Sequence, residues 1–129
     1  MQILLFGKTS SITTTIKTML QSIEEWSVQL QSDLLNIKKS DEEQSNLDLI
    51  IANLEDFEKA STKVVSTIHI RFPDTPLLVI HSYLNKALIK PMITAGATGY
   101  MQNDVSDNKL IEAVQKVASG TKCIIAEST

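Results

Sequence analysis

The chain has 129 residues, of which 43% are hydrophobic and 21% are charged, and its formal net charge at pH 7 is −3. This length and composition suit one globular domain with a single core that needs no disulfide or metal to hold it. No long basic run is present, which argues against direct nucleic-acid contact by this segment.

The cysteine count and the N-terminal residues bear on the cellular compartment. Cys123 is the one cysteine, so an intramolecular disulfide is excluded and a reducing compartment is favoured. The apolar start Ile3–Phe6 is too short for a signal peptide or a membrane span. We therefore expect a cytoplasmic protein without membrane contact.

The first half of the chain alternates between strand and helix patterns. Ile3–Phe6 is a short apolar run that predicts a buried strand, and Trp26–Leu30 alternates as a half-exposed strand does. Between these two strands, apolar residues recur at helical spacing and predict a helix: Ile12, Ile16, Met19, Leu20 and Ile23. After the second strand, the acidic, polar residues Ser40–Asn46 are typical of an exposed helix end and loop.

The second half continues the alternation. Leu47–Leu54, Leu77–Ile80 and the residues around Tyr100–Met101 are further apolar runs of strand type. Two helical stripes lie among them, one with Phe57, Ala60, Val64 and Ile68, the other with Leu110, Ile111, Val114, Val117 and Ala118. Continuous apolar strands suit a parallel sheet covered on both faces. The alternation therefore predicts a doubly wound α/β domain.

Local chemistry marks several helix boundaries. Ser10 or Ser11 can cap the first helix and Ser106 the last, since a serine oxygen accepts from the free N–H groups of a first turn. Gly96 and Gly120 follow helical stripes and suit the left-handed residue that ends a helix.

Pro91 falls within the helix that we expect after the strand Leu77–Ile80, the fourth helix of the alternation. Proline is costly inside a helix and tolerated in its first turn. Two alternatives follow: the helix is kinked at Pro91, or residues Leu84–Lys90 are looser and the helix begins near Pro91.

The stretch Ala95–Asp104 resembles the pattern A-G-A-x-G-Y-L-x-K-D of response-regulator receiver domains, and its continuation to Gly120 resembles the NarL/FixJ-type subfamily. The resemblance extends over almost the whole chain. It implies a CheY-like sheet of five parallel strands in the order 2-1-3-4-5, with helices on both faces. It also implies a receiver domain over residues 1–121. Residues 122–129 would be a C-terminal tail or the start of a linker to an effector domain.

The positions that carry phosphoryl transfer in this family differ here. The phosphoacceptor aspartate is replaced by Asn53, and the two acidic residues after the first strand by Gly7 and Lys8. His81 stands in place of the hydroxyl residue, and Asn103 in place of the lysine. Phosphoryl transfer requires a nucleophile and charge compensation by metal and lysine. The resemblance thus implies a degenerate receiver, or pseudo-receiver, with no metal and no cofactor.

Several of these residues admit two interpretations. In the first interpretation, Lys8 supplies the positive charge once given by a metal and pairs with Glu55, Asp56 or Asp104. In the second, Lys8 reaches solvent and the former pocket holds residues without a role. His81 is a pH switch or an ordinary polar strand end. Tyr100 resembles the switch aromatic of the family, and the alternative is a fixed aromatic packed on its strand.

For function, the sequence favours regulation over catalysis. No nucleophile–base pair, glycine-rich phosphate loop or carboxylate pair stands at the strand ends, so we expect no enzyme. We expect a regulatory domain that binds a protein partner or a second copy. Its contact surface would be the face of the fourth helix, fifth strand and fifth helix, or the face of the first and fifth helices. The alternative is a ligand-sensing module that binds a small molecule at the degenerate pocket.

Overall fold

Strands and helices alternate along the chain in the computed structural model, which describes residues 1–8, 10–31, 47–54, 61–81, 86–102 and 107–125. The order is β1 (Gln2–Phe6), α1 (Ser11–Gln21), β2 (Ser27–Gln31), β3 (Leu49–Asn53), α3 (Ser61–Arg71), β4 (Leu77–His81), α4 (Lys86–Ala95), β5 (Gly99–Gln102), α5 (Asp107–Ala118) and β6 (Cys123–Ile125). None of the described helices is long and apolar enough to cross a membrane.

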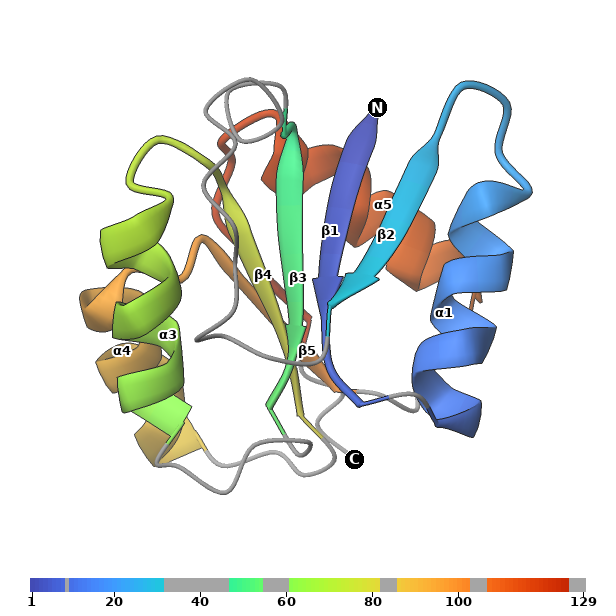
Figure 1. Cartoon of the computed structure of the whole chain (residues 1–129). Coiled ribbons are helices and arrows are strands. Elements are labelled where there is room, and N and C mark those ends of the chain that lie inside the picture. Colours follow the sequence, from blue (N-terminus) through green and yellow to red (C-terminus); the bar gives the residue numbers. More distant parts are fainter. Residues whose placement is uncertain (9, 32–46, 55–60, 82–85, 103–106, 126–129) are drawn as a thin grey trace.

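The strands form one parallel sheet in the order β2-β1-β3-β4-β5-β6. The first five strands in chain order, β1 to β5, are labelled in Figure 1. The central strands are closely aligned, with Phe6 opposite Ala52 and Ile80 opposite Met101. The expected doubly wound fold and its strand order 2-1-3-4-5 are confirmed.

A sixth strand extends the expected sheet. β6 pairs with β5 in parallel and places Cys123 opposite Gly99. It lies in residues 122–129, which the sequence assigned to a tail or linker. A run of three residues is too short to carry a periodicity signal, so the sequence analysis did not predict this strand.

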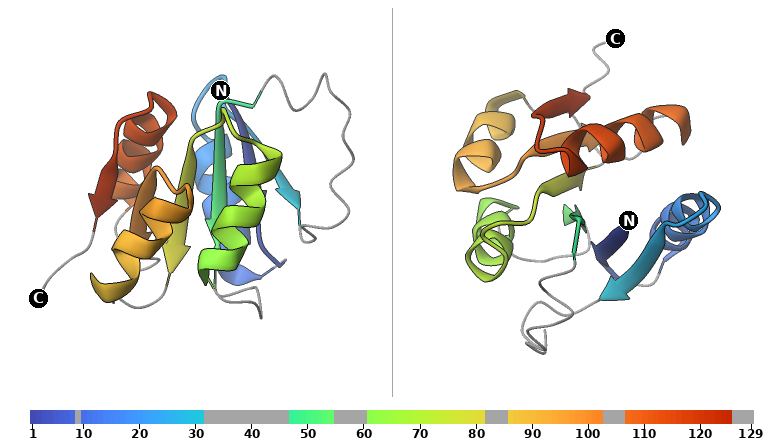
Figure 2. Two further views of the ribbon diagram at one scale, coloured as in Figure 1. Left: turned by 90° about the vertical axis from the view of Figure 1, so that its left-hand side faces the viewer. Right: turned by 90° about the horizontal axis from the view of Figure 1, so that it is seen from above.

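Two hydrophobic clusters cover the two faces of the sheet. Strand residues such as Leu5 and Ile51 pack with residues of α1 and α5, including Leu20 and Val114. Their neighbours along the strands point the other way and pack with α3 and α4; the buried residues of this second cluster include Phe6, Ala52, Val65 and Met92. Figure 2 shows these two helical layers on either side of the strands.

Ser10 caps the first helix, as one of the two alternatives predicted. Its hydroxyl accepts from the Thr13 backbone N–H at 3.3 Å, and the Ser10 N–H donates to Thr13 Oγ1 at 2.9 Å. This capping box satisfies N–H groups that a helix start otherwise leaves unpaired. Ser106, the cap predicted for α5, lies outside the described residues.

Gly96 and Gly120 end α4 and α5 with left-handed conformations, as predicted; their φ angles are 128° and 87°. At α4 the Gly96 N–H donates to Ile93 O and the Ala97 N–H to Met92 O, at 3.1 and 3.0 Å. This is the Schellman arrangement. A Cβ at Gly96 would also overlap the side chain of His69 on α3. The glycine therefore permits both the turn and the close approach of the two helices.

Pro91 lies inside α4, which begins at Lys86. The alternative in which the helix starts near Pro91 is therefore wrong. Proline lacks the N–H that an interior position would donate, and its ring is exposed on the helix surface.

Candidate functional site

The carboxyl ends of three adjacent strands bring Gly7, Asn53 and His81 to one edge of the sheet. Phe6 is opposite Ala52, so Gly7 follows β1 beside Asn53 at the end of β3. Asn53 in turn is opposite Ile80, the residue before His81. In an open α/β sheet this edge is where ligands bind. Asn103, predicted at the same edge after β5, lies outside the described residues.

Asn53 is buried at the centre of the sheet, with 1% of its surface exposed. Because side chains alternate along a strand, the Asn53 side chain lies on the same face of the sheet as those of Leu49 and Ile51. These two residues belong to the cluster packed against α1 and α5. A charged carboxylate in so buried a place requires a metal ion or a lysine to offset its desolvation. A neutral amide has no such requirement, so the fold accommodates Asn53 without a counter-charge.

His81 ends β4 and is 5% exposed. By alternation it continues the face of Leu77 and Val79, on the side of α3 and α4. Asn53 and His81 thus share an edge but belong to opposite faces of the sheet. The atoms Asn53 Oδ1 and His81 Nδ1 are buried and make no hydrogen bond, although both residues have other interactions.

The turn after β1 combines a buried glycine with an exposed lysine. Gly7 donates its N–H to Gln31 O at 3.0 Å, which joins the ends of β1 and β2. The carbonyl of Lys8 accepts from Thr13 Oγ1 at 2.7 Å, which ties this turn to α1. Lys8 is an exposed residue, and it has a further interaction. Its predicted partners Glu55, Asp56 and Asp104 lie outside the described residues, so their pairing with Lys8 stays a prediction.

Tyr100 is buried in β5, with 1% of its surface exposed, and packs in the cluster beneath α3 and α4. A buried ring fits a fixed aromatic packed on its strand and also fits the buried position of a switch aromatic, so the choice between these two interpretations stays open. Movement of Tyr100 between two positions stays a prediction.

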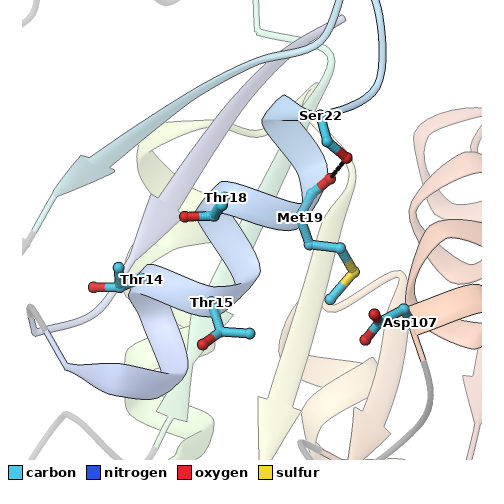
Figure 3. A pocket seen from close by; sticks show the side chains of 6 residues that line it. All are labelled: Thr14, Thr15, Thr18, Met19, Ser22 and Asp107. Carbon is cyan, nitrogen blue, oxygen red and sulfur yellow. Dashed lines mark hydrogen bonds between the residues drawn. The ribbon is translucent and has the colours of Figure 1, made fainter.

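Two open hollows lie between helices on the outer surface. The first, of about 400 Å³, separates α1 from the start of α5 and is lined by Thr14, Thr15, Thr18, Met19, Ser22 and Asp107 (Figure 3). The second, of about 770 Å³, lies between α3 and α4 and has Thr62, Pro91 and Ala95 among its lining residues. The sequence analysis named the α1–α5 face as a contact surface but not the hollow, because helical periodicity does not report how far apart two helices stand.

Solved structures are similar to this chain in fold, whereas family models and curated proteins give no match. No family model and no curated protein matches the chain. A two-component response regulator of the LuxR family from Aurantimonas sp. SI85-9A1 is 15% identical with a TM-score of 0.80, over 95% of this chain and 87% of that chain. A LuxR family DNA-binding response regulator from Silicibacter pomeroyi is 17% identical with a TM-score of 0.78, and each chain is covered to 100%.

The response regulator ChrA of a heme-sensing two-component system is 20% identical with a TM-score of 0.73, over 95% of this chain. This chain spans 58% of the length of ChrA. At sequence identities this low, structural similarity is evidence for the fold alone. The similarity, together with the strand order and the two helical layers, shows that the chain has the fold of response-regulator receiver domains.

Proposed function

We propose that the chain is a regulatory receiver domain of a two-component-type signalling protein or transcription regulator, and that it acts without phosphorylation. It signals by contact with a protein partner or by dimerisation. The main support for this proposal is the buried side-chain amide of Asn53. It stands at the end of β3, where phosphorylation of a receiver domain needs a carboxylate nucleophile.

The chemistry at this edge supports the proposal. In the phosphorylation of receiver domains, a carboxylate oxygen attacks the phosphorus of a phosphoryl donor, and the bond from phosphorus to the donor's leaving group breaks as the acyl phosphate forms. A divalent cation and a lysine balance the charge that develops. The side-chain amide of Asn53 is neutral and a poor nucleophile. Gly7 and Lys8 place no carboxylate after β1 to hold a cation. The residues present therefore do not fit a magnesium ion of the kind that the family resemblance would imply.

Contact signalling needs a surface, and the described residues favour the α1–α5 face. The hollow between these helices presents hydroxyl groups, the Met19 thioether and the Asp107 carboxylate to a partner. Further along α5, Lys116 and Glu112 form an ion pair at 2.8 Å, and the hydrogen bond from Lys116 lowers the pKa of the Glu112 carboxyl. That part of α5 is charged and exposed, which favours a contact nearer the start of the helix.

A ligand-sensing role is the second candidate. It is favoured by the burial of two polar side chains, Asn53 and His81, at the sheet edge where ligands bind in related folds. A small molecule that raises the melting temperature of the chain and shifts the NMR signals of these two residues would support this role. Association that depends on protein concentration alone would support contact signalling.

The proposal is tested by incubation of the chain with acetyl phosphate and magnesium, followed by intact mass measurement. We expect no phosphorylated species, because the amide at Asn53 cannot form the acyl phosphate. Asn53→Gln is the matched control and should behave identically, since it also lacks a carboxylate. Phosphorylation of the chain that disappears in Asn53→Gln would overturn the proposal.

A further inference from the structure

The helices α3 and α4 differ in charge from the rest of the chain. Together they contain four of its 12 Lys and Arg residues and none of its 15 Asp and Glu residues. The formal net charge of the whole chain is −3, so acidic residues predominate outside these two helices. Lys63 on α3 and Lys90 on α4 are exposed. The outer surface of this helical layer is therefore a basic region on an acidic protein.

The larger of the two hollows lies within this basic region. α3 and α4 stand side by side on one face of the sheet (Figures 1 and 2), and the hollow between them has a volume of about 770 Å³. Its lining combines small side chains, a proline ring and one cation: Thr62, Ala87, Lys90, Pro91, Thr94 and Ala95. No acidic residue is among the described residues that line it. The hollow thus offers room for side chains of a partner beside a positive charge.

Ile70 adds an apolar contact on the outer surface of α3. Its side chain is 77% exposed, whereas Ile12, the other large hydrophobic residue that is exposed in the described part of the chain, is 37% exposed. Lys63 and Ile70 are seven residues apart, so they share one face of the helix. A single exposed isoleucine is ordinary by itself. Beside a basic hollow it supplies the apolar half of a contact, because burial of apolar surface stabilises a complex.

We propose that the α3–α4 surface docks an amphipathic helix of a partner protein, one that carries Asp or Glu residues beside an apolar stripe. The carboxylates of this helix lie against Lys63 and Lys90, and its apolar side chains cover Ile70 and enter the hollow. The inference rests on the proposed function, because it gives a partner to a domain that signals by contact. It adds a surface to the α1–α5 face, since α1 and α5 cover the opposite face of the sheet.

Charge and shape favour this occupant over two others. A second copy of the chain that presented the same surface would bring like charges together, which is unfavourable at an interface. Nucleic acid binds through many cations spread along a backbone, and here two exposed lysines flank a neutral hollow. An amphipathic helix places apolar anchors three and four residues apart, which suits a hollow bounded by two helices.

The first test uses the full chain and a fluorescent synthetic peptide of about 18 residues, long enough to form a helix by itself. The peptide has alanine and leucine along one face and glutamate along the other, and its matched control has glutamine in place of each glutamate. Fluorescence anisotropy gives the Kd. We expect the glutamate peptide to bind at least about tenfold more tightly than the control, and added salt to weaken it. Equal binding of the two peptides would overturn the inference.

Two pairs of variants locate the contact. Lys90→Glu and Lys122→Glu make the same change of charge at exposed positions, and Lys122 lies outside α3 and α4. We expect Lys90→Glu to raise the Kd by about tenfold and Lys122→Glu to change it by less than about twofold. Ile70→Ala should also weaken binding, while Ile12→Ala on α1 should not. Circular dichroism checks that each variant is folded, and equal effects within both pairs would contradict the assigned surface.

NMR of the unmodified chain gives the location without any variant. We expect the glutamate peptide to shift the amide signals of Thr62 and Thr94 and to leave those of Thr18 and Asp107 in the α1–α5 hollow unchanged. Shifts confined to the α1–α5 hollow would overturn the inference. So would a single-stranded oligonucleotide of equal charge that displaces the peptide at a lower concentration than the peptide itself requires. These measurements contain no phosphoryl donor, so their failure leaves the acetyl phosphate result intact, and the reverse also holds.

Discussion

At the scale of single residues, the proposal that this chain acts without phosphorylation depends first on the side-chain amide of Asn53. Asn53→Asp restores the carboxylate in a position that is 1% exposed. We expect the variant to bind magnesium weakly and to remain unphosphorylated, because Gly7 and Lys8 supply no further carboxylate and we expect the Lys8 ammonium to pair with the new carboxylate in place of the metal. An NMR titration with magnesium measures this affinity. Saturable binding at physiological magnesium concentration would show that this one carboxylate is sufficient for magnesium binding, and would contradict the expectation.

Lys8 is a second residue with a definite expectation. It is exposed on the turn after β1, so any ion pair that it forms is screened by water. We expect Lys8→Ala to change the free energy of unfolding by about 0–1 kcal/mol. Urea denaturation measures the difference, with Lys63→Ala on α3, another exposed lysine, as a surface control. A much larger loss than the control shows would place Lys8 in a buried network and contradict this account.

The positions of Gly7, Asn53 and His81 were predictable because each follows an apolar run, and parallel strands end at one edge. Their environments were not. The sequence does not state that Asn53 and His81 belong to opposite faces of the sheet, since that depends on the register between β3 and β4. The roles of Asn103 and Tyr100 stay predictions, since Asn103 lies outside the described residues and the burial of Tyr100 reports one position of the ring.

At the scale of helices and strands, core truncations should cost far more than surface changes. Ile51 in β3 and Val114 in α5 are fully buried, whereas Thr14 on α1 is exposed. We expect Ile51→Ala or Val114→Ala to lower the free energy of unfolding by about 1–4 kcal/mol. Thr14→Ala should change it by less than about 0.5 kcal/mol. Chemical denaturation gives the ranking, and a reversed order would mean that the assigned faces are wrong.

The two helix-ending glycines form a matched pair. Both have positive φ, but a Cβ at Gly96 would overlap His69 and a Cβ at Gly120 would meet nothing within 4 Å. Gly120→Ala should therefore cost about 1–2 kcal/mol from backbone strain. Gly96→Ala should cost more, because α3 and α4 must also separate. Thermal and urea unfolding of the two variants provide the comparison, and equal costs would contradict the close approach at His69.

The apolar stripes predicted where the helices lie better than they predicted which side chains are buried. Ile16 and Leu20 are buried as expected, but Ile12 is 37% exposed while Thr13 is fully buried. Thr13 is inside because its hydroxyl is satisfied by the capping box and by Lys8 O. Apolar periodicity alone does not anticipate a buried threonine whose hydrogen bonds are made locally.

At the scale of the whole molecule, the alternation of strands and helices predicted a doubly wound α/β domain, and the resemblance to receiver domains implied its strand order. The order β2-β1-β3-β4-β5 and the two helical layers agree with the prediction. The sixth strand was missed because its stability comes from pairing with β5, a long-range contact absent from the local sequence pattern. A strand as short as β6 is identified by its pairing with a neighbouring strand, and the pattern of its own residues does not predict it.

We propose that this chain keeps the fold of receiver domains and has lost the phosphorylation chemistry. The most direct measurement is a two-dimensional amide NMR spectrum of the full chain, recorded with and without beryllofluoride and magnesium. Beryllofluoride mimics a phosphoryl group on a carboxylate, and Asn53 offers none. The account predicts no saturable shift at Gly7, Asn53 or Tyr100. Specific, saturable shifts at Asn53 that spread to β5 would contradict it.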